Sequence, residues 1–251
     1  MTSVKIGFIG LGLIGGSIAK AIRRYYPDSE HLAFDKNRET LALAVQEGTI
    51  HTSCSSIDDN FKGCTYIFLC APVAYNTAYL PQLKDLMDSG CILTDVGSVK
   101  TSIHKEVISL GMEESFIGGH PMAGSEKSGF SSSKAHLIEN AYYILTPSAK
   151  VPEEKVTAFR DFISSLKAIP VILDYKKHDY ITGTISHLPH IIASTLVNFV
   201  RDTDSEDELM KALAAGGFKD ITRIASSSPV MWQQICLKNG ENISHILGNY
   251  I

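Results

Sequence analysis

The run Gly10-Leu11-Gly12-Leu13-Ile14-Gly15 constrains the fold of this chain more than any other feature. It follows a short apolar segment, residues 4–9, that is typical of a β-strand, and it precedes residues 17–25, which are typical of a helix. A second strand is expected over residues 31–34. A strand, a tight glycine turn, a helix and a second strand in this order predict a βαβ unit with parallel strands.

The glycine spacing in this context predicts a dinucleotide-binding turn. Gly10 permits the tight turn, Gly12 lets the backbone approach a pyrophosphate, and Gly15 lets the helix pack close to the strand. Leu13 and Ile14 complete this turn and are expected to contact the cofactor, and the helix that follows has N-terminal N–H groups that are available to an anion. The alternative is a plain glycine turn with no ligand.

Asp35 ends the second predicted strand, 35 − 10 = 25 residues after Gly10. A carboxylate at this place accepts hydrogen bonds from ribose hydroxyls and repels a 2′-phosphate, so NAD is favoured over NADP. Lys36 and Arg38 lie close by and leave some room for NADP. The alternative role for Asp35 is a helix N-cap.

The remaining pattern alternates apolar strands with helices up to about residue 173. Such strands predict a parallel sheet that is covered on both faces, the doubly wound α/β class. Later residues carry few strand signals. We therefore expect an α/β domain over residues 1–173 and a smaller all-helical domain over residues 174–251. The expected strands are 66–70, 91–94, 116–117, 142–145 and 171–173, and the expected helices are 38–47, 80–87, 180–200, 204–215, 219–225 and 231–247.

Composition excludes several classes of protein. The net charge of −4 argues against a general nucleic-acid binder. No apolar run approaches the roughly 18–20 residues of a membrane span. The five cysteines are an odd number without a CxxC pair, so neither a disulfide framework nor a metal site is predicted. A reducing, cytoplasmic setting fits this cysteine usage.

Three segments follow predicted strands, where doubly wound sheets bind ligands. Ala71-Pro72 ends one strand and is expected to line the cofactor site, or to be a plain loop. Ser98 either hydrogen-bonds a ligand or caps the next helix. His120, framed by glycines and a proline, is positioned to accept a proton near neutral pH, although a lone histidine is more often structural.

The second domain carries a further set of candidates. His187 and His190 are spaced to share one helix face, and no nearby ligands complete a metal site. Arg223 lies among apolar residues, so it is expected to pair with a carboxylate, either that of Asp220 or that of a bound substrate. Trp232 is expected in the core or in a pocket wall.

Together these motifs resemble the prephenate dehydrogenase family, which includes arogenate dehydrogenases. The resemblance rests on GLGLIGGS at 10–17, DVGSVK at 95–100, GGHPMAGSEKSG at 118–129, SHLPH at 186–190 and AAGGFKDITRIASSSPVMW at 214–232. It implies NAD-dependent oxidative decarboxylation of prephenate to 4-hydroxyphenylpyruvate in tyrosine biosynthesis. It also implies a Rossmann domain followed by a helical domain that forms a homodimer.

The resemblance further implies the role of each site residue. The catalytic base matches His120, and Ser98 matches the serine that orients the substrate hydroxyl. Arg223 matches the arginine that binds a substrate carboxylate, and His190 matches a histidine near the substrate side chain, which favours prephenate over arogenate. The remaining matches line or gate the site: Trp232, Glu126, Gly216 and Asp220.

Two other readings remain open. A β-hydroxyacid dehydrogenase shares the fold plan, but no convincing lysine counterpart lies near residues 165–185. A nucleotide-sensing protein would keep the glycine turn without needing His120 and Arg223 together. From the extent of the sequence we expect no fused chorismate mutase and little room for a regulatory domain, so that any inhibition by tyrosine acts at the active site.

Overall fold

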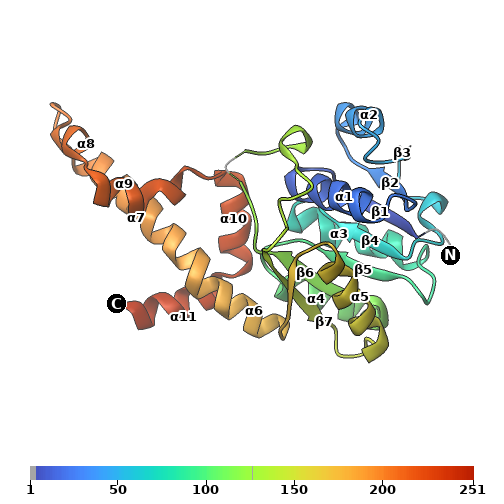
Figure 1. The fold of residues 1–251 in the computed structure, drawn as a ribbon. Coiled ribbons are helices and arrows are strands. Elements are labelled where there is room, and N and C mark those ends of the chain that lie inside the picture. The colour runs from blue at the N-terminus through green and yellow to red at the C-terminus, as the bar shows by residue number, and fades with distance from the viewer. Residues whose placement is uncertain (1–3, 126) are drawn as a thin grey trace. The chain divides into compact units, whose positions relative to one another are not determined.

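The computed structural model describes residues 4–125 and 127–251 and divides the chain into two compact units (Figure 1). Unit 1 ends at His178, and unit 2 runs from Asp179 to Ile251. The boundary predicted from the sequence lies earlier, between residues 173 and 174.

Unit 1 is built around a parallel sheet with the strand order β3-β2-β1-β4-β5. The predicted doubly wound α/β class is thereby confirmed. Because all these strands run in the same direction, their carboxyl ends meet at one edge, where the glycine turn also lies. The strands are β1 (Lys5–Ile9), β2 (Glu30–Phe34), β3 (Thr52–Cys54), β4 (Tyr66–Leu69) and β5 (Ile92–Asp95).

Helices cover both faces of this sheet, as the continuous apolar strands require. Ile6 and Phe8 on β1 point to one face, where they join buried residues of α1 (Leu13–Tyr25) and α5 (Glu153–Ser165). Ile67 and Leu69 on β4 point to the opposite face and join buried residues of α3 (Val73–Lys84) and α4 (Thr101–Ser109). The remaining helix, α2 (Arg38–Gln46), begins at Asn37, whose side chain accepts hydrogen bonds from the first-turn backbone.

A second sheet of unit 1 is mixed rather than parallel, which the sequence did not reveal. It has the order β6-β7-β8, with β6 (Ile117–Pro121) antiparallel to β7 (Tyr142–Pro147) and β7 parallel to β8 (Ile169–Ile172). An isolated parallel bridge between Leu93 and Phe116 places β6 beside β5. The described part of the β6–β7 connection holds only a short 3₁₀ turn, Phe130–Ser132, and no crossover helix that would return the chain for parallel pairing.

Some predicted elements of unit 1 are shifted or were missed. The helix expected over residues 80–87 begins earlier, at Val73. Pro72 is the N-cap of this helix and is not part of a longer loop between the strand and the helix. The strand expected over residues 116–117 continues to Pro121, so that His120 lies within a strand rather than after one. Strand β3 and helix α5 were not predicted.

Unit 2 is helical, and a helix–helix junction in it contains a π-turn. Helix α6 (Tyr175–Thr182) crosses the boundary between the units and continues through a π-helical turn, Gly183–His187, into α7 (Leu188–Thr203). Pro189 has no N–H to donate to the carbonyl of Ile185, and the wider π-turn accommodates this missing bond. Beyond it lie α8 (Leu209–Leu213), α9 (Gly216–Thr222), a 3₁₀ turn (Arg223–Ser226), α10 (Pro229–Lys238) and α11 (Gly240–Tyr250).

The predicted helices of unit 2 differ from the observed ones in their limits. Residues 204–208 are not helical, because the Asp204 carboxylate caps α8 by accepting hydrogen bonds from the N–H groups of Met210 and Lys211, both at 3.0 Å. Gly216 begins α9 instead of ending the previous helix, so the helix predicted over residues 219–225 starts earlier and gives way to a 3₁₀ turn after Thr222. The helix predicted over residues 231–247 is divided at Asn239, where α10 ends and α11 begins.

Candidate active site

Two of the three glycines in the turn of unit 1 are packed too closely for any larger residue. Gly10 has a φ of +94°, and a Cβ on it would lie 2.7 Å from the backbone nitrogen of Ala71. A Cβ on Gly15 would lie 2.5 Å from the Gly10 carbonyl oxygen and 2.8 Å from the Cβ of Cys70. At Gly12, by contrast, an added Cβ would meet no described atom within 4 Å. Two glycines therefore close the turn, and the third leaves its surface open to a ligand.

Helix α1 presents an uncapped N-terminus at this open surface. Its N-cap is Gly12, which has no side chain to bond the first-turn N–H groups, and no acidic residue lies in the first turn. The backbone N–H groups at Leu13 and Ile14 therefore lie where the helix dipole favours an anion. This arrangement fits a pyrophosphate.

Asp35 joins the end of β2 to the glycine turn. One carboxylate oxygen accepts a hydrogen bond from the N–H of Leu11 at 2.7 Å, and the other accepts one from the N–H of Asn37 at 2.8 Å. Each oxygen retains a lone pair for a further donor such as a ribose hydroxyl. It is Asn37 that caps α2, so the alternative reading of Asp35 as the N-cap is wrong.

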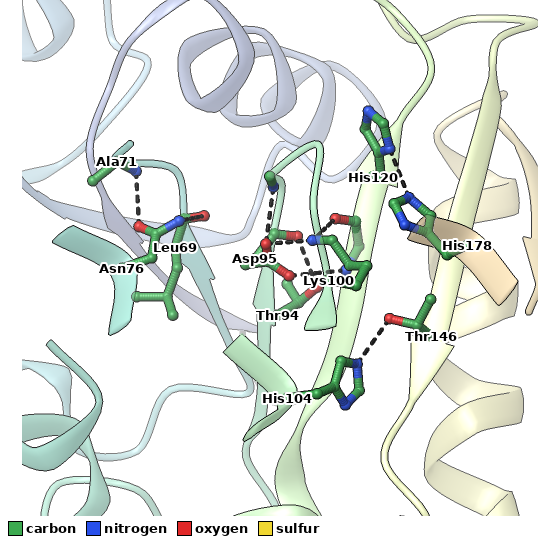
Figure 2. A network of polar contacts seen from close by, with 12 residues as sticks. Leu69, Ala71, Asn76, Thr94, Asp95, Lys100, His104, His120, Thr146 and His178 are labelled. Atoms are coloured by element: carbon green, nitrogen blue, oxygen red, sulfur yellow. Dashed lines mark hydrogen bonds and ion pairs between the residues drawn. The ribbon is translucent and has the colours of Figure 1, made fainter. Parts of the chain in front are cut away.

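A buried asparagine holds the loop after β4. Asn76 of α3 accepts a hydrogen bond from the N–H of Ala71 at 3.1 Å and donates to the carbonyl of Leu69 at 3.3 Å (Figure 2). Ala71 and Pro72 are thereby held next to Gly10. Asn76 was not predicted as a site residue, because nothing in its local sequence pattern distinguishes it from a surface residue.

A buried ion pair connects β5 to β6. The ammonium group of Lys100 contacts the Asp95 carboxylate and donates to the carbonyl of Gly119 at 2.7 Å. Asp95 in turn accepts hydrogen bonds from the N–H groups of Gly97 at 2.9 Å and Gly119 at 3.3 Å. Both charged side chains are almost completely buried, at 0% and 2% exposure. The network therefore fixes the backbone of the residue that precedes His120 (Figure 2).

The glycines before His120 are required by close packing. A Cβ on Gly118 would lie 2.4 Å from Oγ1 of Thr146, and a Cβ on Gly119 would lie 2.6 Å from the backbone oxygen of Asp95. Strand β6 can approach β5 and β7 this closely only with glycine at both positions. The two glycines are thus required by the packing of β6, and they also position the histidine that follows them.

His120 is hydrogen-bonded to a second histidine, which the sequence analysis missed. Its Nδ1 lies 2.8 Å from Nε2 of His178, and the two rings are inclined at 63° (Figure 2). His178 is completely buried, whereas His120 is partly exposed. The two residues are 58 positions apart, so only the fold brings them together.

Ser98 lies in the loop between β5 and α4 and is partly exposed. Helix α4 has Lys100 at its N-cap position and no side-chain capping hydrogen bond. The alternative reading of Ser98 as a helix cap is therefore wrong. Ser98 thus lies in the segment between Asp95 and Lys100, the two residues of the buried ion pair.

Unit 2 contains its own aromatic cluster. The ring of His190 stacks on Trp232 with 3.6 Å between centroids and 3° between planes, and His187 meets the same indole edge-on at 6.0 Å. Burial lowers the pKa of His190 and so favours its neutral form. Asn239 donates one hydrogen bond to Nδ1 of His187 at 2.9 Å and another to the carbonyl of Asp179 at 2.8 Å. The two histidines do share one face, as their spacing predicts.

The remaining sequence candidates lie on or beside α9 of unit 2. Gly216 begins this helix, Asp220 lies within it, and Arg223 follows it as the first residue of the 3₁₀ turn; all three are exposed. Glu126 lies outside the described residues. Within residues 4–125 and 127–251, no group of three or more His, Cys, Asp or Glu side chains is arranged to hold a metal ion.

Comparison with known families accounts for both units. Residues 18–172 match the family model described as prephenate dehydrogenase, nucleotide-binding domain, and residues 174–251 match prephenate dehydrogenase, dimerization domain. The chain belongs to the prephenate dehydrogenase family. The resemblance inferred from the motifs is thereby confirmed. The first matched range begins after the glycine turn, so the assignment of residues 10–15 rests on their geometry.

Curated relatives agree with this membership. The chain is 40% identical over 240 residues to prephenate dehydrogenase of Bacillus subtilis and 42% identical over 241 residues to that of Lactococcus lactis. These matches cover 93% and 94% of the chain but only 64% and 65% of the relatives' own length. Cyclohexadienyl dehydrogenase of Zymomonas mobilis is 31% identical, over 98% of the chain and 84% of that protein.

Solved structures show the same fold. A prephenate dehydrogenase from Aquifex aeolicus, in complex with hydroxyphenyl propionate and NAD⁺, matches with a TM-score of 0.92 and 32% identity, over 100% of this chain and 87% of that one. Arogenate dehydrogenase from Synechocystis matches with a TM-score of 0.87 and 29% identity, over 98% and 88%. A 3-hydroxybutyryl-CoA dehydrogenase from Escherichia coli, at 16% identity and a TM-score of 0.58 over 79% and 43%, shares the fold alone.

Proposed function

We propose that this member of the prephenate dehydrogenase family catalyses the NAD-dependent oxidative decarboxylation of prephenate to 4-hydroxyphenylpyruvate, a step of tyrosine biosynthesis. The observation that carries the proposal is the placement, within unit 1, of His120 on the strand next to β5 and at the same sheet edge as the glycine turn. An oxidation of an alcohol to a carbonyl needs a proton acceptor beside a hydride acceptor, and this edge provides for both.

The residues of the turn fit NAD. The N–H groups of Leu13 and Ile14 would bind the pyrophosphate, with Gly10, Gly12 and Gly15 allowing its approach.

Asp35 would bind the adenine ribose hydroxyls and disfavour a 2′-phosphate, while Ala71 and Pro72 would line the site. When bound, NAD supplies the acceptor for the hydride lost from the substrate. We accordingly propose that residues 1–173 form the cofactor-binding domain.

His120 would act as the general base. Its imidazole takes the proton of the substrate's C4 hydroxyl as that carbon is oxidised, and Ser98 orients the hydroxyl. The C–C bond to the ring carboxylate then breaks, CO₂ leaves, and the bonding pair restores an aromatic ring. The resulting phenolate oxygen recovers the proton, so the protein is unchanged at the end of the cycle.

The second domain, residues 174–251, would bind the rest of the substrate and form the dimer. Arg223 would bind a substrate carboxylate, and His190 and Trp232 would contact the side chain. Glu126, Gly216 and Asp220 would line or gate the site.

A homodimer through unit 2 is supported by the matching dimerization-domain model and by large exposed apolar side chains. They include Phe199 (63%), Val230 (67%), Leu237 (75%) and Leu213 (76%).

In the described residues no helix is both long and apolar enough to cross a bilayer. A cytoplasmic location is part of the proposal. It is supported by five free thiols, three of them buried.

Steady-state kinetics with both substrates and both cofactors tests the function. We expect NADH to form with prephenate and NAD, with a lower kcat/KM for arogenate and for NADP. A higher kcat/KM with arogenate would assign the alternative activity of the family. No reduction of either cofactor with either substrate would reject the proposal.

A further inference from the structure

His178 is held rigidly against the proposed base. Its helix, α6, begins at a capped turn, in which the Asp174 carboxylate accepts hydrogen bonds from the N–H groups of Lys176 at 2.8 Å and Lys177 at 3.1 Å. The ring of Tyr175 stacks on His104 with 4.4 Å between centroids and 12° between planes. His178 itself is fully buried. Its position is thus fixed by its burial and by the contacts of the helical turn that precedes it.

A hydrogen bond between two imidazoles has a direction, and here the direction decides the chemistry. Only one of the facing nitrogens, Nδ1 of His120 or Nε2 of His178, carries the shared proton, because the other must offer a lone pair. If His120 donates from Nδ1, the ring lone pair of neutral His120 lies on Nε2, which can then accept a proton. If His178 donates, neutral His120 carries its proton on Nε2 and cannot act as a base there.

We propose that His178 is a positioning residue that accepts the hydrogen bond from Nδ1 of His120 and so holds Nε2 of His120 ready to take the substrate proton. The inference rests on the proposed function, since it assigns His120 the role of base. The backbone on the amino side of His120 is already fixed by the Asp95–Lys100 network. The contact with His178 acts on the ring itself, on its orientation and on its tautomer (Figure 2).

The same contact supports the reaction after the proton has moved. Protonated His120 donates from Nδ1 with a charged donor, and such hydrogen bonds are roughly twice as strong as neutral ones. His178 therefore strengthens its bond at the moment when His120 becomes an imidazolium. A carboxylate in this place would do so more strongly but would also bring a second charge into a buried position.

Two substitutions of His178 separate positioning from packing. In His178→Gln, the side-chain oxygen has the same number of bonds from Cβ as Nε2 of histidine and can accept the hydrogen bond. In His178→Leu, the volume is roughly kept but no acceptor remains. His136→Gln, at an exposed histidine of the same unit, is the matched control.

We expect His178→Leu to lower kcat for prephenate by about 100-fold, because His120 would lose the hydrogen bond that sets its orientation and tautomer. This value is at the low end of the roughly 10²–10⁴-fold contribution of a general base. KM should change little, and His178→Gln should recover at least about tenfold of the lost kcat. His136→Gln should match the wild type. A kcat for His178→Leu within about threefold of the wild type would overturn the inference, as would a Gln variant no better than the Leu variant.

The tautomer of His120 can also be observed without turnover. Long-range ¹H–¹⁵N correlation spectra of the wild-type histidines report which ring nitrogen is protonated, and the His120→Asn spectrum identifies the His120 signals. We expect a protonated Nδ1 and an unprotonated Nε2. The opposite tautomer would overturn the inference. A protonated Nδ1 in a protein that turns over neither prephenate nor arogenate would uphold the hydrogen-bond assignment and reject the proposed function.

Discussion

Replacing Lys100 by Met should destabilise unit 1 strongly. The substitution keeps an unbranched side chain but removes the cation from a pair in which Lys100 is 0% and Asp95 is 2% exposed. Asp95 would keep the hydrogen bonds from the N–H groups of Gly97 and Gly119, whereas the Gly119 carbonyl would lose the ammonium donor at 2.7 Å. A buried carboxylate would then lie without its counter-charge.

The magnitude follows from this burial. Removing one partner of a buried ion pair costs about 3–5 kcal/mol, because the other charge remains uncompensated. The two backbone donors that Asp95 retains place the expected loss near the lower limit, at about 3 kcal/mol of unfolding free energy. Since a domain of this kind is stable by only about 5–15 kcal/mol, the effect is a large share of the total.

Urea unfolding followed by circular dichroism measures this loss. The fluorescence of Trp232, the single tryptophan, reports on the helical unit 2 separately. The control is Lys150→Met, which removes an ion pair with Glu113 at 2.7 Å whose lysine is 63% exposed, and which should leave the stability nearly unchanged. If Lys100→Met were no more destabilising than this control, the argument from burial would be refuted.

Three further predictions concern other parts of the chain. Protonation of His190 should quench the fluorescence of the stacked Trp232, with a midpoint below the ordinary value of 6.5 because burial lowers its pKa, and His190→Gln should abolish this pH dependence. Burial lowers the pKa of His31 to about 4, so the unfolded state takes up the proton first as the pH falls. The free energy of unfolding should therefore be highest above about pH 6.5 and fall by about 3 kcal/mol towards pH 4. Urea titrations across this range should show a flatter profile for His31→Gln. Arg223→Gln should raise the KM for prephenate by about 10–100-fold with little change in kcat, since it removes a charged hydrogen bond to a bound carboxylate, and initial-rate kinetics would show an unchanged KM if the role is wrong.

The first βαβ unit was predictable because its signals are local. Gly10, Gly12, Gly15 and Asp35 follow from the requirements of a single turn, and the structure gives the packing reason for the first and third of these glycines. Apolar strands likewise indicated a sheet covered on both faces. Limits of helices were less predictable where a side chain acts on a distant backbone, as Asp204 does at α8.

The contacts around the candidate base could not be predicted from sequence. The His120–His178 bond joins residues 58 positions apart, and the Lys100–Gly119 bond crosses from a loop to a strand. Histidine and lysine are ordinarily exposed, so the sequence offers no sign that His178 and Lys100 are fully buried. A fixed pairing of this kind becomes visible only once β5, β6 and α6 are placed in space.

The most direct test of the account compares binding with turnover in His120→Asn. The asparagine keeps a polar side chain on β6 but cannot accept and return a proton near neutral pH. Calorimetric titration with NAD and initial rates with prephenate would be measured on the same preparation. We predict an NAD affinity equal to that of the wild type and a kcat lower by at least about 100-fold. A variant that binds NAD normally and still turns over prephenate at the wild-type rate would contradict the assignment of His120 as the base.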